Sequence, residues 1–359
     1  MRIVVLPGDG IGPEITAATI AVLEAVDKRL SLGLQFETNE IGFASLNRAG
    51  TTFPDEVLEA CRRADGILLG PVSHLDYPPR EQGGINPSGH LRIGLDLYAN
   101  IRPSRSRTGL PHWGRTPMDL VIVRENTEGF YSDRNMHLGI GEFMPTPDVA
   151  LSVRKITMRA SRRIAKSAFE LARTRRRKVT AVHKANVLKI TEGLFLGEVR
   201  KVALDYPEVA CDEQLVDSMA ALLVRDAARF DVVVTTNLYG DILSDEAAEL
   251  SGSLGLAASI NAGDTHCMAQ AQHGSAPDIA EQDRANPASL ALSAAMLLGW
   301  LARKHGRDEY ATAERLIDAA IDELIAAPAT RTPDLGGALG TKAFTAALSD
   351  RVRTSGGRG

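Results

Sequence analysis

Short runs of apolar residues alternate along the chain with longer stretches in which apolar residues recur every three or four positions. The short runs are rich in β-branched residues and bounded by Gly, Asp or Arg, as buried strands are; they span residues 3–6, 67–69, 120–123, 179–182 and 232–234. The longer stretches predict amphipathic helices that begin at Pro13 and cover 289–304 and 311–327. This alternation predicts an α/β fold with a largely parallel sheet.

The composition is that of an ordinary globular protein long enough for two domains. The 359 residues are 44% apolar and 24% charged, with a formal net charge of −4. Because this balance is slightly acidic, we expect no nucleic-acid partner, and we interpret the basic run at 173–178 as a solvated helix end rather than a polyanion patch. The sequence has no run of 18 apolar residues and no leader-like pattern, so we expect no membrane association and a cytoplasmic location.

Two aspartates four positions apart follow the predicted strand at 232–234. In Asn237-Leu-Tyr-Gly-Asp-Ile-Leu-Ser-Asp245 the sequence predicts a glycine turn and a helix start, and the spacing puts Asp241 and Asp245 on one helix face. Like charges there repel unless a cation lies between them, and hard oxygen ligands suit Mg²⁺ or Mn²⁺. A solvated acidic face is the alternative. Asp217 is a third acid in an apolar setting, and by itself such an acid is more often a helix cap or a core hydrogen-bond acceptor than a metal ligand.

Three arginines occupy positions where anion contacts are expected. Arg124 ends the buried strand at 120–123, Arg92 lies in Leu91-Arg-Ile-Gly94, and Arg102 lies in Asn100-Ile-Arg-Pro103. Open α/β sheets bind ligands at the carboxyl ends of their strands, and guanidinium groups grip carboxylates with two parallel hydrogen bonds. The three together indicate a substrate with several carboxylates, whereas each alone is equally well explained by a surface ion pair.

Lys184 and Tyr131 each have two interpretations. Lys184 follows the strand at 179–182, in His183-Lys-Ala-Asn-Val187, as either a strand-end charge or a desolvated base or anion contact. Tyr131, in Glu128-Gly-Phe-Tyr131, is either a core tyrosine or a proton donor. Residue type and position alone leave both alternatives open.

Two glycine-containing loops bear on nucleotide binding. His273-Gly-Ser-Ala-Pro-Asp278 consists of small residues whose amides suit phosphates, and its Asp can accept a hydrogen bond from a ribose 2′-hydroxyl. Gly8-Asp-Gly-Ile-Gly-Pro13 looks like a dinucleotide fingerprint, but its glycine spacing differs and no acid follows the next strand in the expected way. We therefore do not interpret it as a Rossmann phosphate loop.

Taken together, these motifs resemble the β-decarboxylating dehydrogenases, the family of isocitrate, isopropylmalate, homoisocitrate and tartrate/D-malate dehydrogenases. The resemblance runs from Leu6-Pro-Gly-Asp-Gly10 to Pro333-Asp-Leu-Gly-Gly337 and is strongest at 237–245 with 252–255, and at 273–279 with 286–287. It implies the two-domain α/β isopropylmalate/isocitrate dehydrogenase-like fold with a mainly parallel sheet, not a Rossmann fold. Residues 1–99 plus 252–359 would form a discontinuous large domain that binds the cofactor, and 100–251 a domain for substrate, metal and dimerisation.

The resemblance also implies an activity and a role for each matching residue. The activity is the NAD-dependent, divalent-metal-dependent oxidative decarboxylation of a (2R)-type 2-hydroxy acid with two or three carboxylates, in a homodimer with shared active sites. Tyr131 would donate a proton to the enol carbon, and Lys184, contributed by the partner subunit, would act on the base side. The substrate would contact Asn86, Ser88, Arg92, Arg102, Arg124 and Asn186. Mg²⁺ or Mn²⁺ would be held by Asp241, Asp245 and Asp217 of the partner subunit; NAD would be held by Ile11, His273, Gly274, Ser275, Ala276, Pro277, Asp278, Ile279 and Asn286.

Local departures within the family pattern bear on cofactor and substrate. NADP-using relatives place a basic residue followed by Tyr where this chain has Asp278-Ile279, so NAD is favoured. The stretch Gly84-Ile-Asn-Pro-Ser-Gly-His-Leu91 lacks the leucine pair of isopropylmalate enzymes and the aromatic residue of tartrate/D-malate enzymes. The stretches 124–131 and 183–192 look more like the isocitrate and homoisocitrate branch. We expect an isocitrate- or homoisocitrate-like substrate, with 3-isopropylmalate and D-malate or tartrate as alternatives.

Two other classes of protein are weaker interpretations. A non-catalytic regulatory subunit of this family would lack the tyrosine, the lysine or the metal aspartates, all of which are present. A metal-free Rossmann reductase would carry the fingerprint that is missing here. Gln270 replaces the usual Glu before the His-Gly-Ser loop, and Glu281-Gln-Asp283 replaces the common Gly-Lys-Gly, so the detailed cofactor contacts differ. The loop at 133–148, which has little periodicity, is expected to be a dimer arm.

Overall fold

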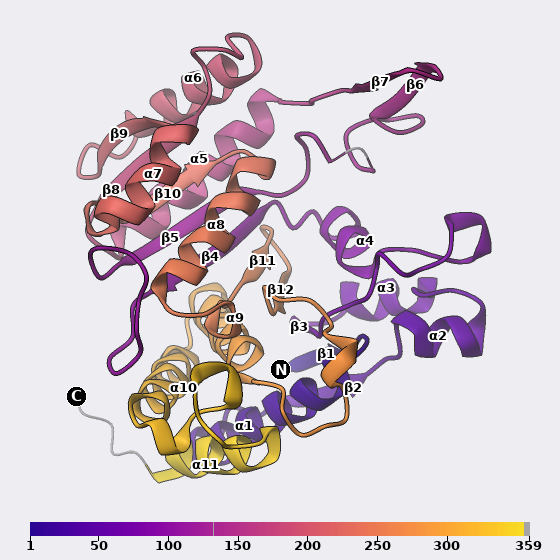
Figure 1. The fold of residues 1–359 in the computed structure, drawn as a ribbon, viewed down its shortest axis with the longest axis vertical. Coiled ribbons are helices and arrows are strands. Elements are labelled where there is room, and N and C mark those ends of the chain that lie inside the picture. The colour runs from indigo at the N-terminus through magenta and orange to yellow at the C-terminus, as the bar shows by residue number, and fades with distance from the viewer. Residues whose placement is uncertain (132, 355–359) are drawn as a thin grey trace. The chain divides into compact units, whose positions relative to one another are not determined.

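A computed structural model describes residues 1–131 and 133–354, and the chain divides into two compact units (Figure 1). The first unit comprises Met1–Leu95, Arg107–Pro111 and Ser253–Gly359, and the second comprises Asp96–Ser106 and His112–Gly252. The sequence places the boundaries after residues 99 and 251, whereas the units divide after residues 95 and 252. The short segment at 107–111, expected in the second domain, belongs to the first unit.

The described part of the first unit contains strands in the order β2-β1-β3-β12-β11. They are β1 (Arg2–Leu6), β2 (Gln35–Thr38), β3 (Gly66–Leu69), β11 (Ile260–Ala262) and β12 (Cys267–Gln270). β1 pairs in parallel with β2 and β3, and β3 in parallel with β12, whereas β11 is antiparallel to β12. The apolar runs expected at 3–6 and 67–69 form β1 and β3, where helices cover both faces and successive side chains are buried.

The helices of the first unit are α1 (Gly12–Leu30), α2 (Gly42–Ala49), α3 (Asp55–Arg62), α4 (Pro87–Gly94), α9 (Ala288–His305), α10 (Asp308–Ala326) and α11 (Thr341–Thr354). The helix expected to begin at Pro13 is α1, and those expected at 289–304 and 311–327 are α9 and α10. α9 packs against β12 on one side and α10 on another, so its small and apolar residues are buried almost all round.

The second unit has strands in the order β4-β5-β10-β8-β9, of which only β4 runs antiparallel to its neighbour. They are β4 (Ala99–Arg105), β5 (Asp119–Glu125), β8 (Lys178–His183), β9 (Ala210–Leu215) and β10 (Val232–Thr235). Because successive side chains point to opposite faces, Val121 and Val123 pack on the side of α5 (Met158–Arg173) and α6 (Thr191–Ala203). Leu120 and Ile122 pack on the side of α7 (Val216–Asp226) and α8 (Asn237–Ser251) (Figure 1).

The segment expected to be a loop at 133–148 is partly a β-hairpin. β6 (Glu142–Thr146) pairs antiparallel with β7 (Val149–Ser152), and every residue of both strands is exposed. The sequence misses this hairpin because its side chains are covered on neither face and show no burial period. None of the helices in the described part of the chain combines the length and the apolar character needed to span a bilayer.

Candidate active site

Arg124 is the centre of a buried cluster at the carboxyl end of β5. Its side chain is 1% exposed. Nε donates to Asn237 Oδ1 at 2.9 Å, Nη2 donates to the Tyr131 hydroxyl at 2.6 Å, and Nη1 donates to Asp241 Oδ1. The guanidinium thereby joins β5, the start of α8 and the segment that follows β5. Since a buried cation is costly unless its hydrogen bonds are made, this arrangement fixes all three partners.

The Tyr131 hydroxyl lies between a cation and a carboxylate. It accepts a hydrogen bond from Arg124 and donates one to Asp241 Oδ2. The guanidinium groups of Arg124 and Arg134 also lie 5.2 and 5.0 Å from the centroid of its ring, where the ring attracts them. A phenol held and polarised in this way suits a proton donor better than a core tyrosine.

Arg102, on β4, adds a second buried cation to the same cluster. Its Nη1 donates to Ser244 Oγ at 2.8 Å and lies 3.2 Å from an oxygen of Asp241 and 3.3 Å from one of Asp245. Burial, followed by repulsion from Arg124, lowers the pKa of Arg102 to about 10. The side chain is still protonated at neutral pH, so two positive charges face one helix.

Gly240 is a site residue whose role the sequence prediction misses. The glycine turn expected before the helix is wrong, because Gly240 lies within the first turn of α8. A Cβ at this position would stand 2.6 Å from both Cβ and Cγ of Arg124. Only glycine therefore lets α8 approach β5 closely enough for Asp241 to reach the guanidinium.

Asp241 and Asp245 lie one turn apart on α8, and both carboxylates are accessible. Their side chains are 35% and 56% exposed, and each contacts an arginine. The oxygen donors and their charge fit a hard divalent cation. Among the residues that the structure describes, however, no three Asp, Glu, His or Cys side chains form one metal-binding group. The third predicted ligand, Asp217, is therefore not brought to this pair within the chain.

Asp217 instead pairs with Lys184. Lys184 follows β8, Asp217 lies in the first turn of α7, and the Nζ–Oδ1 distance is 2.5 Å. This hydrogen bond from Lys184 lowers the pKa of Asp217. The two side chains are 26% and 62% exposed, and the predicted substrate residue Asn186 and its neighbour Val187 are exposed beside them. The second unit thus presents two separate groups of predicted site residues.

Two buried glutamates hold the segment that leads from Arg124 to Tyr131. Glu125 accepts hydrogen bonds from the amide and hydroxyl of Thr127, and Glu128 accepts from the amide of Thr157 at 2.8 Å and its hydroxyl at 2.9 Å. The Glu128 carbonyl also accepts from Asn237 Nδ2 at 2.8 Å. Burial, followed by the charge of Glu125, raises the pKa of Glu128 to about 7. The sequence analysis did not single out either glutamate or Asn237.

The predicted substrate residues of the first unit gather on α4. Ser88 Oγ and Arg92 Nη2 both donate, at 3.0 and 3.3 Å, to Oε1 of Gln270, which is the last residue of β12. Asn86 is the N-cap of α4, and its side chain accepts from the Gly89 amide at 3.3 Å. Asn86 therefore has a structural role that accounts for it, whereas Gln270 orients the two residues predicted to contact substrate.

The loop predicted to hold the cofactor packs against the glycine-rich segment after β1. The Ile11 amide donates to the Ser275 carbonyl at 2.8 Å, and the hydroxyls of Ser73 and Ser275 are 2.7 Å apart. A Cβ on Gly10 would stand 2.0 Å from the same carbonyl oxygen, so this contact requires glycine. The segment 8–13, which does not match the Rossmann fingerprint, serves here as a support for the predicted cofactor loop.

The remaining residues predicted to bind the cofactor differ in whether their polar groups already form hydrogen bonds within the chain. Asp278 is exposed, and within the described residues its carboxylate makes no hydrogen bond or ion pair. Asn286 donates to Asp334 at 2.9 Å and accepts from the Ala288 amide at the start of α9. Burial lowers the pKa of His273. The other loop residues are the exposed Gly274, Ala276 in a left-handed conformation, and Pro277 and Ile279, which bound a short 3-10 helix.

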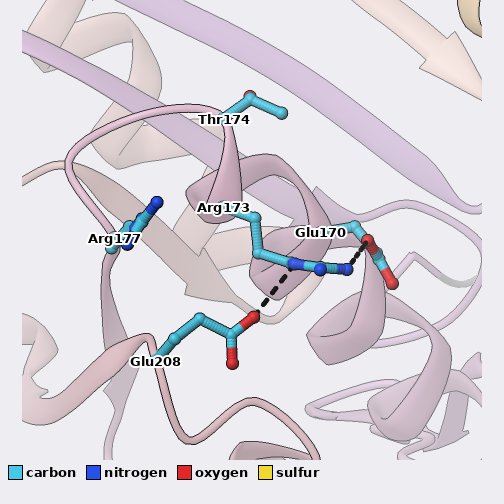
Figure 2. A pocket seen from close by; sticks show the side chains of 5 residues that line it. All are labelled: Glu170, Arg173, Thr174, Arg177 and Glu208. Carbon is cyan, nitrogen blue, oxygen red and sulfur yellow. Dashed lines mark hydrogen bonds and ion pairs between the residues drawn. The ribbon is translucent and has the colours of Figure 1, made fainter.

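A pocket of about 370 Å³ lies beside the C-terminal end of α5, where the basic run begins (Figure 2). Arg173, the last residue of α5, lies between Glu170 and Glu208 and forms ion pairs with both. Further along the run, Arg175 pairs with Asp119 and Asp231. The run does end a helix, as expected, but much of its charge is compensated by neighbouring carboxylates rather than solvated. No predicted site residue lines this pocket.

Arginines, a tyrosine and helix-borne aspartates thus lie together in a mainly parallel α/β fold, and the comparisons show that this is the fold of a dehydrogenase family. The family model described as isocitrate/isopropylmalate dehydrogenase matches residues 2–352. An isocitrate/homoisocitrate dehydrogenase of Thermus thermophilus is 43% identical over 356 residues, 98% of this chain and 99% of that protein. A 3-isopropylmalate dehydrogenase of Methanothermobacter thermautotrophicus is 41% identical over 350 residues, 97% and 98% of the two chains.

The solved structures give the same result. The crystal structure of isocitrate dehydrogenase from Methylococcus capsulatus matches with a TM-score of 0.86 and 39% identity over 98% of this chain and 99% of that one. The chain therefore belongs to the isocitrate/isopropylmalate dehydrogenase family. The resemblance inferred from the motifs and the predicted fold class are confirmed, and the protein is an oxidoreductase of a small hydroxy acid.

Proposed function

We propose that this enzyme catalyses the NAD-dependent, divalent-metal-dependent oxidative decarboxylation of an isocitrate- or homoisocitrate-like acid. The observation that carries this proposal is the cluster in which Arg124 holds both Tyr131 and Asp241. It brings together three residues to which the resemblance assigns substrate-carboxylate binding, proton donation and metal coordination. The isocitrate/homoisocitrate relative, at 43% identity, supports this substrate branch.

The two buried arginines of the second unit bind the carboxylates of the substrate. Arg102 and Arg124 are held rigidly by β4 and β5, so little side-chain entropy is lost when they form bidentate contacts. Their present carboxylate partners, Asp241 and Asp245, keep the charges balanced before substrate arrives. In the first unit, Gln270 orients Ser88 and Arg92, the residues to which the resemblance assigns further substrate contacts.

Asp241 and Asp245, with Asp217 of the partner subunit, would hold the metal. Their oxygen chemistry and accessibility fit Mg²⁺ or Mn²⁺. A divalent cation bound there supplies Lewis-acid chemistry that stabilises negative charge on substrate oxygens. The aspartates would hold the cation, and their ion pairs with Arg102 and Arg124 would keep it near the arginines proposed to bind the substrate carboxylates.

Lys184 and Tyr131 move the protons. Lys184 of the partner subunit, in its neutral form, accepts the proton of the substrate hydroxyl as hydride departs, and its hydrogen bond with Asp217 keeps its head group at the strand end. Tyr131 donates a proton to the carbon from which CO₂ has left, and the Arg124 cation at its hydroxyl makes that donation easier.

The loop 273–279 and Asn286 would hold NAD, which accepts the hydride when bound. Asp278 is exposed with a carboxylate available to a ribose 2′-hydroxyl, and it would repel a 2′-phosphate. We expect Asp278→Lys combined with Ile279→Tyr to shift the NAD-to-NADP ratio of kcat/KM toward NADP by about tenfold or more, since a differential interaction of about 1.4 kcal/mol changes the ratio tenfold. An unchanged ratio would refute the assignment of Asp278.

A homodimer accounts for residues that the single chain leaves incomplete. Lys184, Asp217 and Asn186 form an accessible group, with the apolar Val187 and Ile190 exposed next to it. The hairpin 142–152 is likewise exposed, with Phe143, Met144 and Leu151 on its surface. Exposed apolar patches of this kind mark interfaces. We infer that a second copy of the chain covers both the Lys184 group and the hairpin. The second unit is then the domain for substrate, metal and dimerisation, and the first unit holds the cofactor.

The experiment that tests the proposal is a substrate panel. We would measure kcat/KM with NAD and Mn²⁺ for isocitrate, homoisocitrate, 3-isopropylmalate, D-malate and tartrate, and repeat the best substrate after chelation with EDTA. We expect isocitrate or homoisocitrate to rank first and activity to vanish with EDTA and return with Mn²⁺. Activity that survives chelation contradicts the metal requirement, and absence of turnover with every acid favours a regulatory subunit.

The same panel tests the second candidate substrate, 3-isopropylmalate. The 3-isopropylmalate dehydrogenase relative, at 41% identity, is nearly as similar as the first. An isopropyl group needs an apolar pocket, whereas Ser88, four residues before Arg92, is polar and its hydroxyl is bound to Gln270. A higher kcat/KM for 3-isopropylmalate than for either tricarboxylate would overturn our ranking of substrates.

A further inference from the structure

A buried arginine outside the predicted site touches three segments that carry site residues. Arg154 follows the hairpin, and its side chain is 7% exposed. Its guanidinium lies 5.3 Å from the ring centroid of Phe130, which precedes Tyr131, and 5.2 Å from that of Tyr239, in the first turn of α8. The face of an aromatic ring attracts a cation, and more strongly when both are desolvated. Arg154 thereby connects the tyrosine segment to the helix of the metal aspartates.

The same guanidinium makes two hydrogen bonds that extend this connection. Nη2 donates to the hydroxyl of Thr236, the residue before α8, at 2.8 Å, and also to Oε1 of Glu192. Glu192 lies in the first turn of α6 and is fully buried. Its other oxygen, Oε2, accepts from the main-chain amide of Lys184 at 2.8 Å. The two oxygens of the Glu192 carboxylate therefore have different partners. Oε1 accepts from Arg154, and Oε2 accepts from the backbone of the predicted catalytic lysine.

Lys184 needs this acceptor because the sheet ends one residue before it. The pairing of β8 with β9 stops at His183, and its pairing with β10 stops at Val182. The Lys184 amide thus lies beyond both strand ladders. A carboxylate forms a stronger hydrogen bond to it than a neutral group would. Burying that carboxylate is costly unless a cation accompanies it, and Arg154 supplies the cation.

We propose that Arg154 and Glu192 are positioning residues, which fix the main chain at Lys184 relative to Tyr131 and the start of α8. The proposal rests on the function assigned to Lys184 above. Because the direction of a side chain follows from its main chain, a shift of the Lys184 amide displaces Nζ from its working position. Displacements of about 1 Å at a reacting group cost on the order of 10²-fold in rate.

The first part of the test uses four variants of the full-length protein. Glu192→Leu removes the acceptor of the Lys184 amide, Glu192→Gln keeps an oxygen there, Arg154→Met removes the cation, and the double variant Arg154→Met/Glu192→Leu removes both buried charges. Arg162→Gln is the matched control, since it breaks an Arg–Glu pair between α5 and α6 whose arginine is exposed and whose glutamate keeps Lys201 as a partner. For each we would measure Tm, KM, kcat and hydrogen exchange at the Lys184 amide of ¹⁵N-lysine-labelled protein.

We expect Glu192→Leu to lower kcat by about 100-fold while KM changes little, because positioning of the base and not substrate binding is lost. Exchange at the Lys184 amide should accelerate in the same variant. Glu192→Gln should retain slow exchange and most of kcat. In the double variant Tm should return toward that of the unsubstituted protein, because no unpaired charge is left, while kcat stays low. Arg162→Gln should change none of these quantities appreciably.

Two results would overturn the proposal. If the double variant recovers kcat together with Tm, the pair acts only through stability. If the Lys184 amide still exchanges slowly in Glu192→Leu, Glu192 does not hold the main chain there. A failure of the proposed function has another signature: the unsubstituted protein would turn over none of the hydroxy acids, while the exchange rates would still respond to Glu192.

Discussion

Two groups of charged residues in the second unit differ in how far the chain encloses them. Arg124 on β5 and Arg102 on β4 are both buried and both contact Asp241, and Arg124 also binds Tyr131. Lys184 and Asp217 form a pair whose carboxylate is mostly exposed. We call the first the arginine cluster and the second the lysine pair. The chain itself buries the arginines of the arginine cluster, whereas the lysine pair remains accessible to solvent or to a second chain.

The difference teaches which substitutions affect folding and which affect only activity. Removing one member of a buried charge cluster leaves the others desolvated and uncompensated, which costs about 3–5 kcal/mol. An exposed ion pair contributes only about 0–1 kcal/mol, because water and salt screen it. Variants of the arginine cluster should therefore lose stability and turnover together, and variants of the lysine pair should lose turnover alone.

The largest effect is expected for Arg124→Met. It removes the donor to Asn237, Asp241 and Tyr131 as well as the proposed substrate contact, so kcat/KM should fall by about 10³-fold or more and Tm should fall clearly. Arg124→Lys should recover little, since an ammonium cannot reproduce the planar fork. Steady-state kinetics and thermal unfolding check both variants. An Arg124→Met protein with the Tm of the parent would show that the cluster is not stabilised in the way described.

Mixing of inactive variants tests whether the lysine pair serves a second chain. Lys184→Met and Asp245→Asn homodimers should each be nearly inactive. If active sites are shared, a heterodimer has one site with both defects and one site with neither. Random reassociation of equal amounts should then restore about one quarter of the parental activity, since half of the dimers are mixed and half of their sites are intact. Activity that remains at the level of the separate variants would place Lys184 and Asp245 in the same site of one chain.

A methyl group at Gly240 should disturb the arginine cluster without changing any charge. Gly240→Ala places a Cβ 2.6 Å from two carbon atoms of Arg124, and overpacking of this kind costs about 1–3 kcal/mol. Gly197→Ala on α6 is the matched control, because no atom lies within 4 Å of its added Cβ. That control should stabilise the protein by about 0.5–1 kcal/mol, as expected for glycine in a helix interior. Thermal unfolding that ranks the two variants the other way would contradict the close approach of α8 to β5.

The smallest expected effects are on the pH dependence of stability. They have opposite signs in the arginine cluster and in the lysine pair. Near the arginine cluster, burial and Glu125 raise the pKa of Glu128 to about 7. The folded state therefore binds a proton that the unfolded state has released, so the stability contribution present below the unfolded pKa of about 4.3 is lost as pH rises through about 7. Glu128→Gln should flatten the decline of Tm between pH 5 and 8. An identical pH profile in the variant would argue against this assignment.

In the lysine pair the pKa of Asp217 is lowered by the hydrogen bond from Lys184. Its contribution is therefore present above the unfolded pKa of about 3.9 and is lost as pH falls through the lower folded value. Asp217→Asn should leave Tm at neutral pH nearly unchanged and slightly reduce the sensitivity to acid below pH 4. A large loss of Tm at pH 7 would mean that the pair is less open than its exposure indicates.

The sequence predicted β1, β3, β5, β8 and β10, but it missed β4, β11 and β12 as well as the outer strands β2 and β9. β1, β3, β5, β8 and β10 are covered on both faces, so their apolar β-branched runs are visible locally. β2 and β9 carry exposed and half-buried polar residues and exist because a neighbouring strand supplies hydrogen-bond partners. That neighbour is distant in sequence, and no local period records it.

The residues of the candidate site likewise fall into those that local sequence patterns predict and those that depend on contacts between distant segments. The spacing of Asp241 and Asp245 could be interpreted from helix geometry alone, and α8 does carry both. The need for glycine at 240 could not, because it depends on the distance between α8 and the side chain of Arg124. Glu192 and Gln270 likewise act through contacts between segments far apart in sequence. Roles taken from the resemblance, such as those of Lys184 and Asn186, remain predictions for the experiments above.

The hairpin formed by β6 and β7 has a consequence for the lifetime of the protein. Proteases bind their substrates as extended strands, and residues 142–152 present two such strands with every side chain accessible in the single chain. A chain that has not met a partner should be cleaved there first, while a chain whose hairpin is covered should resist. Degradation would then remove unassembled copies selectively, so the amount of this enzyme would follow its assembly as well as its synthesis.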